Sequence, residues 1–98
     1  MAKKSIDINK LLGMCGKYDI SFLGIFGSYV HGTFTPESDL DLLARFSQRK
    51  SLMDLLGIER GNSENLGVKV DLLTEKSISP YLRDRIMSDL KVIYERKG

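Results

Sequence analysis

The sequence predicts a small α/β (α+β) domain in which helices lie mainly on one face of a mixed β-sheet. Short apolar runs bounded by Gly, Pro and Ser indicate strands. Segments with helical periodicity separate those runs, which gives an α-β-α-β-α-β-α-β order. The chain has 98 residues, so we take 1–98 as one domain with one modest core.

The composition is ordinary for a globular protein, with 42% hydrophobic and 29% charged residues. The net charge is +2 and there is no basic stripe, which argues against a nucleic-acid partner. No apolar run approaches the roughly 20 residues of a membrane span. The amino terminus also lacks the apolar segment of a signal peptide. We therefore expect a cytoplasmic protein without membrane contact.

The first predicted element is a helix over Ser5–Tyr18. Ile8, Leu11, Leu12 and Cys15 follow the i, i+3, i+4, i+7 spacing of one helical face. Cys15, the only cysteine, lies on this apolar stripe and is expected in the core rather than as a nucleophile.

Two strands follow, one on each side of a turn. Ile20–Phe26 is short and apolar and is expected to be a buried strand. Ser28–Gly32 is expected to form a short helix, and Thr33–Ser38 a loop. Asp39–Phe46 alternates at its start and predicts a second strand whose first residues belong to a site.

The second half of the chain repeats this alternation. Ser51 and Asp54 have the spacing of a capping box, which predicts a helix to about Asn62. Residues 61–67 are expected to break it. Its apolar face would comprise Leu52, Leu55 and Leu56.

Val68–Leu73 predicts a third strand by its alternation and β-branched residues. Ser79 and Pro80 predict the start of a helix, as cap and first helical residue. The expected apolar side of this helix is Leu82, Ile86 and Leu90, and Val92–Tyr94 would add an edge strand.

Three aspartates stand at strand positions among apolar neighbours. Strand side chains repeat every two residues, so Asp39 and Asp41 point the same way. Asp71 can join them if its strand lies beside theirs. Two close carboxylates repel, and Mg²⁺, which takes carboxylate and phosphate oxygens, would relieve the repulsion. The alternative is that Asp39 caps a turn while Asp41 and Asp71 are merely exposed charges.

A Gly-Ser turn precedes the aspartates by ten residues. Gly27 lacks a Cβ, so a ligand can approach its backbone closely. Ser28 offers a hydroxyl at the start of a helix, where free N–H groups attract anions. Gly-Ser alone is often just a tight turn, but followed by Asp39-x-Asp41 it predicts a Mg-nucleotide site.

The Gly27-Ser28, Asp39-x-Asp41 and Asp71 pattern resembles the minimal nucleotidyltransferases of the DNA polymerase beta superfamily. The resemblance covers about residues 20–95. It implies the polymerase beta-like nucleotidyltransferase fold, with Asp39, Asp41 and Asp71 as catalytic and metal-binding residues for two Mg²⁺ ions. ATP is the expected substrate, with its phosphates at Gly27 and Ser28, and pyrophosphate would be released.

His31 departs from this family pattern, because many relatives have Arg at the same position. Arg is permanently charged whereas His is mostly neutral at pH 7, so nucleotide binding could be weaker or depend on pH. The alternative is that His31 packs beside the turn. Lys69 is expected on the same side of its strand as Asp71, where it would bind phosphate, offset charge or remain solvated.

A chain of 98 residues is expected to lack a separate acceptor-binding domain, so the acceptor is expected to come from elsewhere. Stand-alone members of the family are often paired with helical HEPN proteins. The resemblance therefore implies an antitoxin that adds AMP to a tyrosine of a HEPN toxin, in a homo- or hetero-oligomer. One alternative is an inactive module that neutralises a helical partner by contact. Another is the nucleotidyltransferase subunit of an enzyme that modifies a small molecule or RNA.

Overall fold

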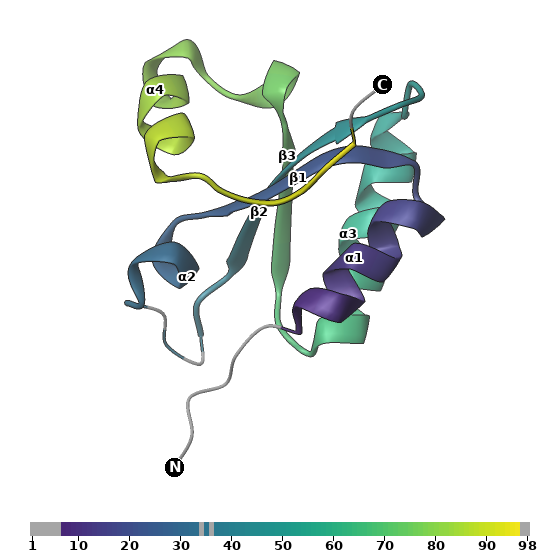
Figure 1. Cartoon of the computed structure of the whole chain (residues 1–98), viewed down its shortest axis with the longest axis horizontal. Coiled ribbons are helices and arrows are strands. Elements are labelled where there is room, and N and C mark those ends of the chain that lie inside the picture. Colours follow the sequence, from purple (N-terminus) through teal and green to yellow (C-terminus); the bar gives the residue numbers. More distant parts are fainter. Residues whose placement is uncertain (1–6, 34, 36, 97–98) are drawn as a thin grey trace.

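The computed structural model describes residues 7–33, 35 and 37–96. Its centre is a four-stranded mixed sheet of order β3-β2-β1-β4 (Figure 1). β1 pairs antiparallel with both β2 and β4, whereas β2 and β3 are parallel. The strands are β1 (Ile20–Phe26), β2 (Leu40–Phe46), β3 (Val70–Thr74) and β4 (Lys91–Glu95).

The helices follow the predicted alternation and confirm the mixed α/β class, but they cover both faces of the sheet rather than mainly one. They are α1 (Ile8–Lys17), α2 (Ser28–His31), α3 (Leu52–Leu66) and α4 (Pro80–Asp89), with a 3₁₀ turn, η1 (Glu75–Ser77), between β3 and α4. α3 makes the crossover that parallel strands require. Figure 1 shows α1 and α3 side by side on one face of the sheet, with α2 and α4 on the opposite side. Among the described residues, no helix has the length and apolar character to cross a bilayer.

The core lies between the sheet and the α1–α3 layer. It is a cluster of buried side chains from α1 and three strands: Leu11, Cys15, Ile20, Leu23, Ile25, Leu40, Leu42, Ala44 and Val70. Alternate residues of β2 therefore face α1 and α3. The intervening ones, including Asp41, face the opposite side of the sheet. The core thus decides which face carries the predicted site.

α1 begins at Ile8, and the Asp7 carboxylate caps it by accepting from the backbone amides of Asn9 (3.0 Å) and Lys10 (3.3 Å). Ser5, the predicted start, lies outside the described residues. The predicted apolar face is partly wrong, because Met14 is buried with Leu11 and Cys15 whereas Ile8 and Leu12 are exposed. Cys15 is a core residue as predicted, and burial raises the pKa of its thiol to about 11.

α3 runs to Leu66, so the predicted end near Asn62 and the break over 61–67 are wrong. Gly61 lies inside the helix, where a Cβ would come within 3.0 Å of the Tyr18 hydroxyl, so close packing on α1 favours glycine there. Gly67, with φ +72°, ends the helix in the left-handed conformation. The capping box between Ser51 and Asp54 is confirmed.

The predicted apolar face of α3 is also wrong, because Leu52 and Leu56 are 72% and 50% exposed. The buried residues are Ile58 and Asn62, and Ile58 is the apolar residue that α3 buries in the core. The Ser79 cap and Pro80 start of α4 are confirmed. Leu90 follows that helix and packs against Gly24 of β1. The strands β2 and β3 begin at Leu40 and Val70, one and two residues later than predicted.

Candidate active site

The register of the parallel pair places two of the predicted carboxylates together. Asp41 of β2 is paired with Asp71 of β3. Both belong to the set of alternate residues that face away from α1 and α3. Asp41 is half-buried and Asp71 is exposed. Asp39 directly precedes β2 and lies near enough to Asp41 for its charge to act on that carboxyl.

The charges of these carboxylates act on one another. The pKa of Asp41 is raised above its ordinary value, first by burial and then by the negative charges of Asp71 and Asp39. Burial and the charge of Asp39 also raise the pKa of the Tyr29 phenol. The three aspartates that the sequence singled out thus lie close enough for the charges of Asp39 and Asp71 to act on Asp41. The structure adds Tyr29, which sequence reasoning missed although it directly follows Gly27-Ser28.

The donor set fits a magnesium ion in chemistry, because it consists of carboxylate oxygens under mutual repulsion. Among the described residues, however, no three His, Cys, Asp or Glu side chains form a ready-made group for a metal ion. Asp39, Asp41 and Asp71 therefore form an open site, which we call the carboxylate face, rather than a metal site enclosed by protein ligands. Mg²⁺ commonly binds such a face through one or two carboxylates and completes its shell with water and phosphate oxygens.

The Gly27-Ser28 turn lies directly against this face. Gly27 has φ +82° and ψ −150°, a backbone region that is essentially restricted to glycine. A Cβ at Gly27 would also collide with Oδ2 of Asp41. Two independent constraints therefore require glycine here, and one of them is the position of the carboxylate. Ser28 begins α2 and Gly32 ends it with φ +71°, both as predicted.

The two remaining predicted residues are held by acidic neighbours. His31 Nε2 lies 3.0 Å from Asp89 Oδ2, so the imidazole joins α2 to the end of α4. Lys69 Nζ lies 3.8 Å from Asp39 Oδ2, where its charge offsets that of the carboxylate. A nucleotide contact by either residue stays a prediction.

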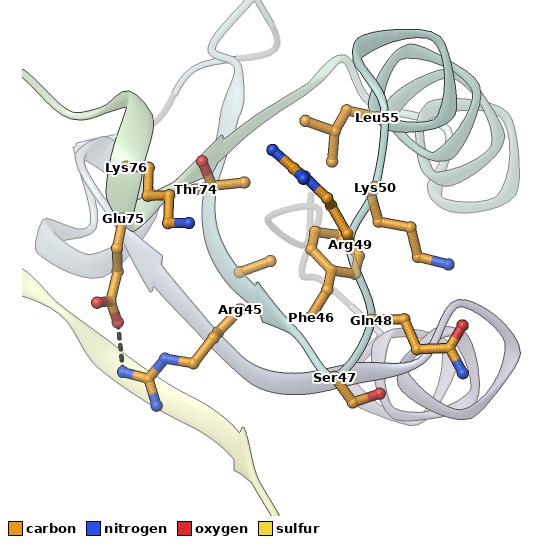
Figure 2. A pocket seen from close by; sticks show the side chains of 11 residues that line it. Arg45, Phe46, Ser47, Gln48, Arg49, Lys50, Leu55, Thr74, Glu75 and Lys76 are labelled. Carbon is orange, nitrogen blue, oxygen red and sulfur yellow. Dashed lines mark hydrogen bonds and ion pairs between the residues drawn. The ribbon is translucent and has the colours of Figure 1, made fainter.

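A basic cavity of about 790 Å³ lies away from the carboxylates. It opens where β2 and β3 end, whereas Asp41 and Asp71 stand near the beginnings of those strands. Figure 2 shows the Arg49 and Lys76 side chains reaching toward Thr74, beside the ion pair of Arg45 with Glu75. No residue that lines this cavity belongs to the carboxylate face, so the two are separate features.

Known proteins resemble this chain over most of its length. A family model described as a nucleotidyltransferase domain matches residues 8–93. A Methanocaldococcus jannaschii relative, provisionally named a protein adenylyltransferase, is 39% identical over 80 residues, which span 82% of this chain and 86% of the relative.

Two solved structures share the fold. The first, a toxin–antitoxin complex with AMP-PNP, aligns at a TM-score of 0.83 and 20% identity over 94% of this chain and 76% of that one. The second is a tri-AMPylated HEPN toxin from Shewanella oneidensis in complex with its MNT antitoxin. It aligns at a TM-score of 0.72 and 18% identity, over 90% of this chain and 69% of that one.

Proposed function

Because the chain belongs to the nucleotidyltransferase domain family, we propose that it transfers AMP from ATP to a tyrosine hydroxyl of a helical HEPN protein. The transfer would silence a toxin, so the chain would act as an antitoxin in the cytoplasm, where ATP is available. The observation that carries the proposal is the register pair of Asp41 and Asp71, with the Gly27 turn packed against Asp41.

The comparisons support the protein acceptor in two ways. Relatives up to 40% identical are provisionally named protein adenylyltransferases. The structural neighbours include toxin–antitoxin complexes, and in one of them the HEPN toxin carries AMP groups. The alignment with the AMP-PNP complex covers 94% of this chain.

The residues would divide the reaction as follows. Asp39 and Asp41 would hold Mg²⁺, which supplies charge neutralisation for the phosphates when bound. The tyrosine oxygen would attack the α-phosphorus of ATP, and the bond from that phosphorus to the bridging oxygen of pyrophosphate would break. Asp71 would complete the cation site and, being exposed, would accept the proton of the hydroxyl. Gly27 and Ser28 would bind the departing phosphates, and Lys69 would offset the charge of Asp39 beside them.

The test is intact-mass spectrometry of a candidate HEPN partner, sought first among helical proteins encoded next to this chain, after incubation with the chain, ATP and Mg²⁺. We expect increments of the mass of an AMP group with the wild type and none with Asp39→Asn/Asp41→Asn. Increments that persist with the double variant would refute the role of the carboxylates. Co-purification without any increment would refute the transfer and favour binding alone.

The contact-only module is the second candidate, and one observation favours it. His31, which was expected to contact the nucleotide, is engaged instead by Asp89 of α4. If contact suffices, Asp39→Asn retains neutralisation of the partner and also retains binding. If transfer is required, Asp39→Asn retains binding but loses neutralisation.

A further inference from the structure

One of the two edge strands of the sheet, β3, carries Asp71. The backbone amides on its outer edge donate hydrogen bonds to side chains. In a strand, successive amides point to opposite edges. The hydrogen bond from the Leu40 amide to the Lys69 carbonyl (2.8 Å) shows that the odd-numbered residues of the β3 segment direct their backbone N–H and C=O groups toward β2. The outward amides belong to Val70, Leu72 and Thr74.

Each of these outward amides donates to a side-chain oxygen. Val70 donates to Ser63 Oγ (2.9 Å), and Leu72 donates to Glu59 Oε2 (2.8 Å). Both acceptors belong to α3 and are partly buried. Thr74 donates to Ser77 Oγ (3.0 Å), which belongs to η1 and is exposed. Ser63 also donates to the Glu59 carbonyl (2.9 Å), so the two residues of α3 form one connected group.

We propose that Glu59 and Ser63 are positioning residues for Asp71. Their two bonds fix the residues on either side of Asp71, so the backbone that carries this carboxylate is held between β2 and α3. The proposal rests on the proposed function, in which Asp71 completes the cation site and faces the acceptor.

The carboxylate face explains why such a clamp is needed. Asp71 has a partner strand on one side, and the residue opposite it there is Asp41, also a carboxylate. Like charges directly opposite each other on neighbouring strands repel and favour separation of the strands. The bonds to α3 fix the position of the β3 backbone where the repulsion acts. They also occupy the outward amides that could otherwise pair with another strand.

The test measures Mn²⁺ affinity by calorimetry in the presence of AMP-PNP, with thermal unfolding recorded for each variant. We expect Glu59→Ala to weaken Mn²⁺ binding about 10-fold, as the loss of a group that orients a metal ligand typically does. Glu59→Gln keeps an oxygen acceptor for the Leu72 amide and should bind close to wild type. Ser77→Ala is the matched control, because it removes the same kind of bond from β3 beside Thr74, away from Asp71.

A double-mutant cycle connects the effect to Asp71. If Glu59 acts through Asp71, Glu59→Ala/Asp71→Asn binds no more weakly than Asp71→Asn alone. Additive losses, wild-type affinity of Glu59→Ala, or an equal loss in Ser77→Ala would each overturn the proposal. So would a Glu59→Gln variant as weak as Glu59→Ala, since charge rather than the hydrogen bond would then matter. Absence of Mn²⁺ binding by the wild type would refute the proposed function together with this inference.

Discussion

Replacing Gly27 with alanine should damage both the fold and the site. Gly27 has φ +82° and ψ −150°, so alanine there carries a backbone cost of about 1–3 kcal/mol. The new Cβ would also overlap Oδ2 of Asp41, so either the turn or the carboxylate must move. A displacement of about 1 Å in such a site can lower the rate about 100-fold.

Gly32→Ala is the matched control for this prediction. Gly32 also has a positive φ, +71°, but a Cβ there would meet no atom within 4 Å among the residues that the structure describes, its two chain neighbours aside. It should therefore carry only the left-handed backbone cost of about 1–2 kcal/mol. At about 4–8 °C for each kcal/mol in a domain of this size, both variants should melt measurably lower than wild type.

The assay combines thermal unfolding with nucleotide binding and AMP transfer. We expect Gly27→Ala to lose transfer and to weaken Mg-AMP-PNP binding even at temperatures where it is fully folded. Gly32→Ala should retain both when folded. If the two variants have equal activity per folded molecule, the contact between the turn and Asp41 has no functional part, and the reasoning is refuted.

Three further predictions concern charge and packing. Because the pKa of Asp41 is raised in the folded protein, the free energy of unfolding falls as pH rises from the ordinary pKa of an aspartate to the raised one. Asp41→Asn should therefore raise the melting temperature at pH 7, and the difference should vanish in acid. Gly24→Ala would place a Cβ against the Leu90 side chain and should lower the free energy of unfolding by about 1–3 kcal/mol, a loss that Leu90→Ala in the same chain should reduce in denaturant titrations. Leu11→Ala should cost about 2–5 kcal/mol in the same titrations, whereas the exposed Leu12→Ala should cost much less; equal losses would contradict the observed orientation of α1.

The local signals in the sequence were sufficient for the order of elements. Ser51 with Asp54, and Ser79 with Pro80, are start signals that act within a few residues, and the structure confirms both. The Gly-Ser and Asp-x-Asp spacing likewise identified the residues of the carboxylate face, because the turn and the strand that carry them are each defined locally.

The rotation of the helices and the end of α3 were decided by packing. An apolar periodicity is also fitted by four exposed residues, Ile8, Leu12, Leu52 and Leu56. Periodicity leaves more than one possible buried face on such helices, and packing against the sheet selects the face that is buried. Gly61 has low helix propensity but lies inside α3, where a Cβ would come within 3.0 Å of the Tyr18 hydroxyl, and the packing outweighs that propensity.

The sequence alone determined which residues are candidates for a nucleotide site. The residue types and spacing of a Gly-Ser turn and an Asp-x-Asp pair can be read directly from it. Only the tertiary structure decided that Asp41 stands opposite Asp71, because that pairing depends on the register of two strands 30 residues apart along the chain. The same holds for the approach of Gly27 to Asp41 and for the bond from Leu72 to Glu59. Such contacts join segments whose separation in sequence carries no local signal, so they follow from how the layers pack.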